Sequence, residues 1–318
     1  MHAVTVADGA LRWREHPDPV PGDDELLVDV RAAGVNAADL LQRQGLYPAP
    51  PGSPADIPGM ELAGVVLAAG VACQRFRAGD RVMAVVGGGA QAERAIVHER
   101  VALRVPPDLP WPEAGGFPEV FTTAHDALLT QCGLAMGERV LIQGAAGGVG
   151  VAGVQVAARA GARVVAAVRS EARRDEVAEL GAACGTVDVV APEDAAARGP
   201  YDVVLEVIGG PNLSDDLEAL ATGGRIAVVV VGAGAHADVN LLALMGKRGR
   251  IHGSTLRARP LEQKARAAQL LASHVLPLLE AGQVRVPVEA TVPMEEATAA
   301  YERFAAGGKF GKIVLVNS

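Results

Sequence analysis

The stretch VLIQGAAGGVG, residues 140–150, decides the fold. A strand predicted over RVLIQ, residues 139–143, runs directly into a glycine-rich turn, and an Ala- and Val-rich helix is predicted from about Val149 to Ala160. A turn of this kind presents bare backbone N–H groups and the positive end of a helix to a pyrophosphate. The sequence therefore predicts a dinucleotide-binding unit.

The segment AAGGVG, residues 145–150, follows most of the G-x-G-x-x-G pattern of such units. Ala145 stands at the first glycine position, whereas Gly147 and Gly150 keep the second and third. Gly147 allows the backbone to approach phosphates, and Gly150 allows the helix to pack closely on the sheet. A tight turn that binds nothing is the alternative. We expect the phosphate contacts to come from Ala146, Gly147, Gly148 and Val149.

Strands and helices alternate after this loop. RVVAAV (163–168) predicts a strand, the next helix is expected from Ser170 to Leu180, and YDVVLEV (201–207) and GRIAVVVV (224–231) predict further strands. The last of these is apolar throughout after Arg225, as expected for a strand covered on both faces. The alternation predicts an α/β fold with a doubly wound parallel sheet.

The end of the strand RVVAAV carries arginine where an NAD site normally places an acid for the ribose 2′-hydroxyl. Arg169 stands at that place, with Ser170 as a neutral donor and Arg173 as a second cation. A guanidinium binds a 2′-phosphate through two hydrogen bonds. These residues favour NADPH over NADH; a solvated first helical turn is the alternative.

The first third of the chain has a different pattern. Short apolar or alternating runs separated by Gly and Pro predict β-rich structure up to about Val105, for example in ELLVDV (25–30) and ELAGVV (61–66). PPDLPWPEAGG (106–116) is expected to hold no regular element and to form a domain boundary.

Near the end of the chain, a helical stretch (261–281), a helix (294–306) and the strand GKIVLV (311–316) are expected.

Composition excludes several functions. The 318 residues suit two domains, and 29 basic against 37 acidic residues give a net charge of −8, the wrong sign for a nucleic-acid binder. Cys73, Cys132 and Cys184 form no CxxC pair, so no disulfide framework or thiolate metal site is expected. The start, MHAVTV, lacks the regions of a secretory signal, and no membrane span is expected. We expect a cytoplasmic, unprocessed protein.

Four segments together resemble the zinc-independent quinone oxidoreductases of the medium-chain dehydrogenase/reductase superfamily. They lie in colinear order over nearly the whole chain: AAGVNAADLLQRQGLYP (32–48), IPGMELAGVV (57–66), VLIQGAAGGVG (140–150) and GKFGKIVL (308–315). The resemblance implies a GroES-like β-rich catalytic domain formed by residues 1–117 and 254–318. It also implies a Rossmann domain over residues 118–253, with NADPH in the cleft between the two.

Alcohol dehydrogenases of the same superfamily hold a catalytic zinc with a cysteine and a histidine of the first domain. Asn36 stands where the cysteine would be, and Met60 replaces the histidine. The four-cysteine lobe for a structural zinc is absent from the sequence as well. His98, His125 and His252 could in principle regroup around a metal, but scattered surface or packing histidines are the preferred interpretation. No metal site is expected.

Without zinc, reduction of an electrophilic acceptor is easier than oxidation of an alcohol, whose alkoxide a Lewis acid would have to stabilise. By resemblance, Tyr47 is the tyrosine at the nicotinamide end, and in related enoyl reductases the matching tyrosine is assigned as the proton donor. Asn36 is expected to offer its amide to the acceptor's oxygen. Thr123 matches a threonine near the nicotinamide carboxamide, although Thr122 could exchange roles with it. Tyr47 could also be a loop residue that merely packs.

The resemblance assigns further cofactor contacts. Gly232 and Ala233, and also Ser254, Thr255 and Leu256, match segments whose backbone faces the nicotinamide half, although packing alone would explain either segment almost as well. Asp188 stands where many relatives carry Tyr or His over the adenine ribose. This departure puts in doubt the contribution of the third strand to the 2′-phosphate site.

The leading functional hypothesis is an NADPH-dependent reductase that transfers hydride to small-molecule quinones or related activated carbonyl compounds. Alternatives are an enoyl or alkenal double-bond reductase, and a crystallin-like protein that binds NADPH with low turnover. By resemblance a homodimer is expected, formed by extending the Rossmann sheet at the strand near residues 250–254. No nucleic acid or membrane partner is expected.

Overall fold

The computed structural model describes residues 1–181 and 187–317, so Cys184 lies outside the described residues. Contacts between Cα atoms divide the chain into two compact units. The first comprises Met1–Glu119 and Leu256–Ser318, and the second comprises Val120–Thr255. These divisions fall after Glu119 and Thr255, against boundaries after residues 117 and 253 expected from the sequence. We describe each unit by itself.

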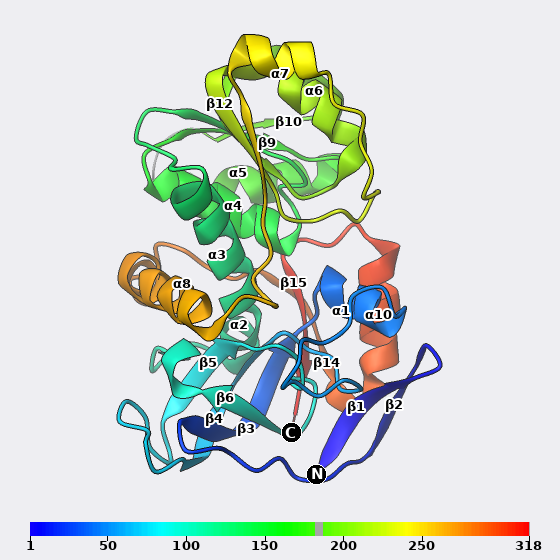
Figure 1. The fold of residues 1–318 in the computed structure, drawn as a ribbon, viewed down its shortest axis with the longest axis vertical. Helices are drawn as coiled ribbons and strands as arrows, with labels where there is room; N and C mark the ends of the chain where they lie inside the picture. Colours follow the sequence, from blue (N-terminus) through cyan, green and yellow to red (C-terminus); the bar gives the residue numbers. More distant parts are fainter. Residues whose placement is uncertain (182–186, 318) are drawn as a thin grey trace. The chain divides into compact units, whose positions relative to one another are not determined.

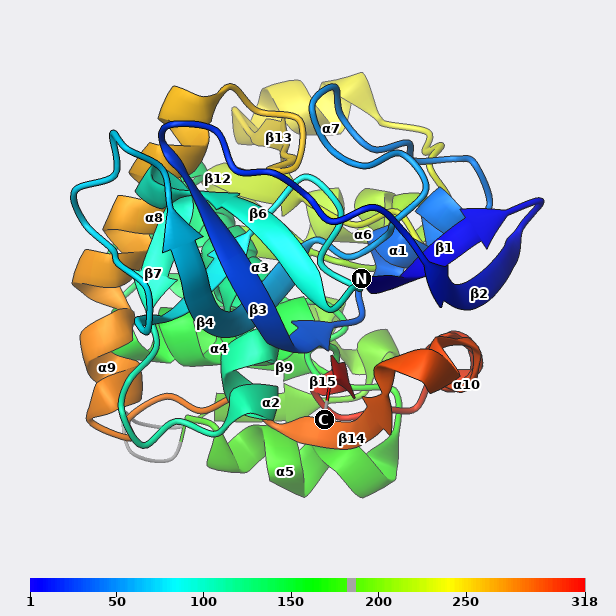
Figure 2. The same cartoon turned by 90° about the horizontal axis from the view of Figure 1, so that it is seen from below.

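The first unit is built on a mostly antiparallel sheet, which Figure 2 shows from below. Within residues 1–181 and 187–317 its strands follow in the order β14 (Val288–Pro293), β15 (Lys312–Val316), β3 (Glu25–Gly34), β4 (Glu61–Ala69), β5 (Arg81–Val85) and β7 (Ala102–Arg104). β6 (Arg94–His98) also pairs with β3, and only β14 and β15 run parallel among these pairs. Strands from the N-terminal part of the chain (β3 to β7) and from its C-terminal part (β14 and β15) thus share one sheet, as the GroES-like prediction requires.

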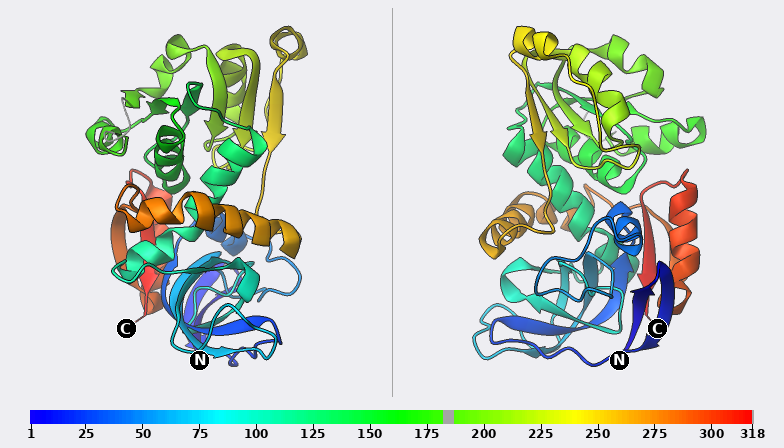
Figure 3. Two further views of the ribbon diagram at one scale, coloured as in Figure 1. Left: turned by 90° about the vertical axis from the view of Figure 1, so that its left-hand side faces the viewer. Right: turned by 45° about the vertical axis from the view of Figure 1, so that its right-hand side comes forward.

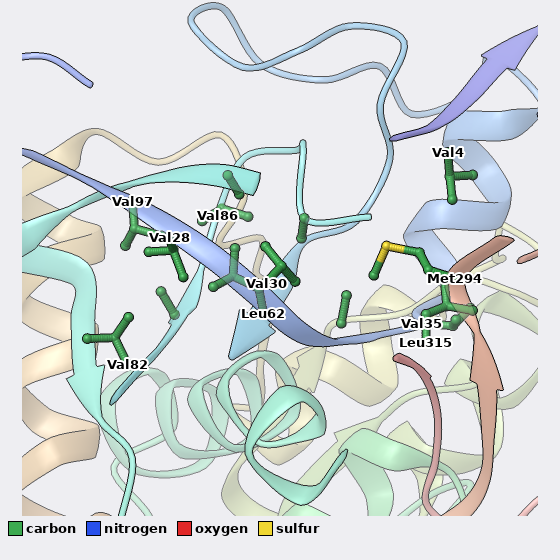
Figure 4. Packing of buried hydrophobic residues seen from close by; sticks show 14 of the residues in the cluster. Val4, Val28, Val30, Val35, Leu62, Val82, Val86, Val97, Met294 and Leu315 are labelled. Carbon is green, nitrogen blue, oxygen red and sulfur yellow. The ribbon is translucent and has the colours of Figure 1, made fainter. Parts of the chain in front are cut away.

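The alternating pattern of β3 sets the core of this unit. Leu26, Val28 and Val30 are buried, whereas the residues between them are partly exposed. All three belong to one buried apolar cluster with Leu62 from β4 and Val82 from β5. Figure 4 shows Val28, Val30, Leu62 and Val82 of this cluster. Burying one face of a sheet in this way fixes the strand register, because a slip of one residue would turn the apolar set to solvent.

Helices and a hairpin complete the first unit. Their bounds are β1 (His2–Ala7), β2 (Ala10–Glu15), α1 (Ala37–Arg43), α2 (Trp111–Gly116), α8 (Leu261–His274), α9 (Leu276–Glu280) and α10 (Ala297–Ala306). The hairpin of β1 and β2 contacts α10, as does α1 (Figure 1). The expectation that residues 106–116 hold no regular element was wrong, since α2 lies there. Pro110 is its N-cap and Pro112 falls in its first turn, where the missing N–H has no intrahelical partner to lose.

The second unit is a parallel sheet flanked by helices. In the part of the chain described, the strands follow in the order β10 (Val187–Val190), β9 (Arg163–Ala167), β8 (Arg139–Ile142), β11 (Tyr201–Glu206), β12 (Leu220–Val228) and β13 (Arg250–Gly253). β13 is the terminal strand of this order, as the two views of Figure 3 make visible. The expected α/β class with a doubly wound sheet is confirmed.

The helices of the second unit are α4 (Gly148–Arg159), α5 (Arg174–Glu179), α6 (Leu213–Glu218) and α7 (Leu241–Lys247), and α3 (Pro118–His125) spans the division between the units. α4 packs on β8 and β9, α5 on β10, and α6 and α7 on β12. The strand expected over residues 224–231 begins earlier, at Leu220, and ends at Val228. None of the described helices has the length and apolar character needed to cross a membrane.

Candidate active site and cofactor site

The glycine loop leaves β8 and enters α4 as the sequence predicts. Gly144 has φ +58°, a conformation that side chains rarely adopt, and it turns the chain out of the strand. A Cβ on Gly150 would lie 2.3 Å from the carbonyl oxygen of Gly144, so the helix approaches the loop more closely than any side chain permits. Gly147 is the N-cap of α4 and has no side chain to occupy the N–H groups of the first turn. The loop therefore fits a pyrophosphate, with Ala146, Gly147, Gly148 and Val149 at the helix N-terminus.

The arginines expected to bind a 2′-phosphate follow β9, the neighbour of β8 in the sheet. Arg169 is exposed and Ser170 partly exposed. Arg173 Nη1 lies 3.0 Å from Oε2 of Glu176, an ion pair within one helical turn. Glu176 thus offsets part of the charge of Arg173, and Arg169 is the more accessible cation at this strand end.

Asp188 lies on β10, at the level of the middle of β9. Its Cα pairs with Val165, whereas Val190 pairs with Ala167 at the end of β9. The Asp188 carboxylate also forms an ion pair with Arg198 at 3.2 Å. The carboxylate therefore lies back from the strand end that carries Arg169, and it is neutralised locally.

The segments expected near the nicotinamide are placed by contacts within the second unit. Thr123 on α3 is partly exposed, whereas its neighbour Thr122 is buried, which favours Thr123 for a ligand contact. Ala233 N donates to the carbonyl of Ile208 at 2.9 Å, which fixes the turn of Gly232 and Ala233. Ser254 Oγ lies 3.3 Å from Oδ2 of the buried Asp126. Thr255 is exposed, and Leu256 is partly exposed where the first unit resumes.

Two buried carboxyl groups lie beneath the glycine loop. Gln143, which joins β8 to the loop, donates through Nε2 to Asp216 Oδ1 at 2.8 Å. Glu206, at the end of β11, accepts from the N–H of Gly209 at 2.7 Å and from Asn212 Nδ2 at 3.1 Å. Burial raises the pKa of Asp216 to about 8, and the neighbouring Glu206 acts on it in the same direction. This acid pair was not anticipated from the sequence.

In the first unit, Asn36 is held by a buried ion pair. Lys312 Nζ lies 2.6 Å from Glu61 Oε1 and donates to Asn36 Oδ1 at 2.6 Å. The Nδ2 group of Asn36 donates to Glu61 Oε1 at 3.0 Å and to Gly34 O at 3.3 Å. Both amide hydrogens are thus used inside the unit. An amide contact from Asn36 to an acceptor's oxygen stays a prediction, and it would require one of these bonds to be given up.

Tyr47 lies in the loop that follows α1. Its ring centroid is 5.2 Å from Cζ of Arg257, and its carbonyl oxygen accepts from Arg257 Nη1 at 3.1 Å. At the other end of α1, Asp39 accepts from the backbone N–H groups of Asn36 and Gly59, and burial raises the pKa of its carboxyl to about 6. Asn36 and Tyr47 therefore flank one short helix, and each contacts a buried cation.

Asn36 and Met60, which the sequence comparison aligned with zinc ligands of alcohol dehydrogenases, are both buried. Met60 is 6% exposed, and Asn36 is bonded as described. Among the described residues, no group of three or more His, Cys, Asp or Glu side chains is arranged to hold a metal ion. Cys73 and Cys132 are free thiols.

Sequence reasoning missed Arg257, Lys312 and Glu61, although all lie within or next to segments it quoted. A signal was present for two of them: Lys312 and Glu61 are charged residues in runs that are otherwise apolar, KIVLV and ELAGVV. A charge within a predicted buried strand requires a partner. The sequence does not indicate which residue is the partner of Lys312 or of Glu61.

Two known families match parts of the chain. Residues 22–107 match the alcohol dehydrogenase GroES-like domain, and residues 175–315 match the family described as zinc-binding dehydrogenase. Quinone oxidoreductase of Mus musculus is 32% identical over 308 residues, which cover 94% of this chain and 91% of the mouse protein.

Two further matches bear on activity. The quinone oxidoreductase of Thermus thermophilus, solved also in complex with NADPH, superposes with a TM-score of 0.83 and 33% identity, and the match covers 100% of each chain. A polyketide synthase protein of Streptomyces orinoci is 35% identical over 96% of this chain but only 14% of its own length. The chain thus belongs to the quinone oxidoreductase family of the medium-chain dehydrogenase/reductase superfamily, and it is an oxidoreductase.

Proposed function

We propose that this protein is an NADPH-dependent reductase that transfers hydride to quinones or related activated carbonyl compounds without zinc. One observation carries the proposal: at the position where zinc-dependent relatives place a cysteine ligand, Asn36 is bonded to Lys312 and Glu61. An amide that is engaged on both sides, with Met60 at the second ligand position, suits packing rather than metal ligation. Alcohol oxidation needs stabilisation of an alkoxide, whereas a quinone accepts hydride directly.

The loop from Gly144 to Gly150 supports a nicotinamide dinucleotide as the cofactor, and Arg169 with Ser170 supports NADPH. NADPH supplies a hydride from C4 of its nicotinamide ring when bound. The protein's part is orientation: the N-terminus of α4 holds the pyrophosphate, and Arg169 pairs with the 2′-phosphate. Thr123, Gly232, Ala233, Ser254, Thr255 and Leu256 are proposed to contact the nicotinamide half.

Tyr47 is proposed as the acceptor-side residue. After hydride transfer an enone leaves an enolate, which must collect a proton, and the Tyr47 hydroxyl is the proposed donor. A hydroquinone anion is a stabilised phenolate that water protonates, so quinone reduction depends less on a donor. Asn36 is proposed to hold the loop-helix segment through Lys312 and Glu61, and to contact the acceptor only after one of its internal bonds opens.

A second candidate, an enoyl or alkenal double-bond reductase, is favoured by one observation. The chain matches a segment of a polyketide synthase protein at 35% identity, slightly above the 32% of the mouse quinone oxidoreductase. Consumption of NADPH with 1,4-benzoquinone, with an alkenal and with an enoyl thioester decides between the candidates. We expect the highest kcat/KM with the quinone; a higher value with the enoyl thioester would reverse the assignment. NADPH binding without consumption would indicate a binding protein.

A homodimer is proposed through β13. This strand ends the described sheet order, and an edge strand exposes backbone groups that a second copy satisfies. Leu241, Leu242 and Met245 on the preceding α7 are 65%, 79% and 70% exposed, an apolar surface next to β13 in the chain. Sedimentation of the wild type and of Leu242→Asp tests this: a monomeric wild type would contradict it. A cytoplasmic location stays a prediction from the sequence.

A further inference from the structure

Arg257 is a buried cation that the proposed function leaves without a role. Its side chain is 3% exposed, and it follows Ser254, Thr255 and Leu256 directly in the chain. Its guanidinium reaches three separate segments of the first unit. Nε donates to Gly87 O at 2.7 Å, Nη1 to Tyr47 O at 3.1 Å and Nη2 to Gln42 Oε1 at 2.5 Å.

These three acceptors are neutral, two carbonyl oxygens and one amide oxygen. Moving a charge from water into the protein interior costs free energy, and hydrogen bonds to neutral groups offset only part of that cost. Burial accordingly lowers the pKa of Arg257, with a smaller opposing effect from the nearby Asp39. What a guanidinium offers at such a place is its shape, a rigid planar fork that can bind several acceptors in fixed directions.

The segment that the fork holds is the Tyr47 loop, defined as residues 44–56. Gln42 closes this loop from the helix side, because its Nε2 donates to Ala55 O at 3.3 Å while its Oε1 accepts from Arg257. The loop lies directly on the turn Gly87–Gly89: a Cβ on Gly87 would come within 2.1 Å of Ser53 Oγ. Arg257 therefore ties the start of the loop, its closing residue Gln42 and the supporting turn to one another.

We propose that Arg257 is a positioning residue that fixes Tyr47 for proton donation by clamping the Tyr47 loop to the Gly87–Gly89 turn. The proposal rests on the proposed function, in which Tyr47 is the proton donor. Arg257 does not touch the acceptor; it acts through the Tyr47 carbonyl and ring. Displacing a catalytic group by about 1 Å costs up to about 100-fold in rate, so a loosened loop should be visible in turnover.

A double-mutant cycle tests the coupling. Arg257→Lys keeps a positive charge but cannot reach Gly87, Tyr47 and Gln42 together. We expect kcat for an enone to fall about 10- to 100-fold. We further expect Tyr47→Phe, which costs about 10²- to 10⁴-fold in the wild type, to cost less than about tenfold in the Arg257→Lys background. Arg266→Lys, the same change at an exposed position on α8, is the control. Tyr47→Phe should cost as much in the Arg266→Lys protein as in the wild type. An undiminished effect of Tyr47→Phe in the Arg257→Lys protein would overturn the proposal.

Hydrogen exchange of the full chain provides a readout independent of turnover. In the loop, Leu46 N donates to Leu41 O at 2.9 Å and Ser53 N to Pro50 O at 3.1 Å. Arg257→Lys should speed exchange in peptides over residues 44–56 and leave the strands β3 and β4 unchanged. Faster exchange throughout the unit would mean that Arg257 stabilises the whole unit, which would contradict a positioning role. Unchanged exchange in the loop would contradict it as well.

Two provisions keep the test decisive. If Arg257→Lys does not fold, Gln42→Met removes the acceptor of Nη2 and also the bond to Ala55 O, whereas Gln42→Glu removes only the bond to Ala55 O. The same coupling and local exchange are expected, at smaller size, for Gln42→Met and not for Gln42→Glu. If Tyr47→Phe alone leaves enone reduction unchanged, the proton-donor assignment fails, and the exchange of residues 44–56 still decides whether Arg257 clamps the loop.

Discussion

Lys312 Nζ lies 2.6 Å from the carboxylate of Glu61, and the two side chains are 3% and 0% exposed. They come from opposite ends of the chain, on β15 and β4. A Cβ on Gly34 would lie 2.2 Å from Glu61 Oε1, so this glycine is what allows the carboxylate to reach its place. The pair also holds both polar atoms of the Asn36 side chain. It therefore joins the N- and C-terminal parts of the first unit at the segment that leads to Tyr47.

Removing one member of this pair should be strongly destabilising. Glu61→Gln leaves the buried Lys312 ammonium without its ion-pair partner, and breaking a buried pair in this way typically costs about 3 to 5 kcal/mol. Urea unfolding of the full chain measures the change. The double variant Glu61→Gln with Lys312→Met should recover most of the loss, since it buries no charge.

A surface pair serves as the control for that experiment. Arg100 and Glu262 form an ion pair at 2.6 Å, but Glu262 is 75% exposed. Glu262→Gln should leave the free energy of unfolding nearly unchanged. Equal losses for Glu61→Gln and Glu262→Gln would show that the buried pair does not stabilise the unit.

The raised pKa of Asp216 predicts a pH-dependent stability. The carboxyl has a pKa of about 8 in the folded protein against an ordinary value of 3.8, so between these values the folded state holds a proton that the unfolded state has lost. The contribution of Asp216 to stability is therefore largest at low pH and falls as pH rises, by up to about 1.4 kcal/mol per pH unit in this window. Asp216→Asn removes the titration and should raise Tm relative to the wild type at pH 8 more than at pH 5.

The neighbouring Asp215 gives the matched control, because it is exposed on the same helix. Asp215→Asn should shift Tm by the same small amount at both pH values. A Tm difference between Asp216→Asn and the wild type that stays constant from pH 5 to pH 8 would mean that Asp216 does not hold its proton in the folded state.

The sequence predicted what local pattern determines. Glycines 147 and 150 between an apolar strand and a helix specify a backbone path, and alternation in residues 25–30 specifies one buried face. The prolines of residues 106–112 argued against a helix, but Pro110 and Pro112 fall at the start of α2, where a helix tolerates proline.

Contacts between distant residues were beyond such reasoning. Lys312 meets Asn36 and Glu61 because β15 pairs with β3 in the sheet. Arg257 meets Gln42, Tyr47 and Gly87 because the chain returns to the first unit at Leu256. The sequence marks these residues as charged within apolar surroundings, but many pairings satisfy that condition. The choice among them is made by the order of strands in the sheet, which no short pattern encodes.

Cofactor selectivity should depend on Arg169. If its guanidinium binds the 2′-phosphate, Arg169→Ala removes a charge-assisted interaction worth about 1.5 to 3 kcal/mol, or about 10- to 100-fold in NADPH affinity. NADH affinity should hardly change. Arg163→Ala, at the opposite end of the same strand, is the control and should leave both affinities unaltered. Fluorescence titration measures them, and an equal loss for NADH and NADPH in Arg169→Ala would place that arginine elsewhere.

Tyr47→Phe separates quinone from enone chemistry. The change keeps the ring beside Arg257 and deletes the hydroxyl. We expect kcat to fall by well under about 100-fold with a simple quinone, and by more with an enone, because only the enolate needs a positioned acid. A solvent isotope effect on enone turnover should disappear in the variant. Loss of quinone turnover with normal NADPH binding would refute a donor-independent quinone reduction.

The most direct test of the account is NADPH oxidation by 1,4-benzoquinone after exhaustive chelation, with the metal content of the same sample measured by elemental analysis. We predict that turnover and Tm stay unchanged while zinc is far below stoichiometric amounts, because no binding free energy of a metal is coupled to folding or to hydride transfer. Turnover that is lost on chelation and restored by added zinc would contradict the account, as would a chelated protein that binds NADPH but transfers no hydride to the quinone.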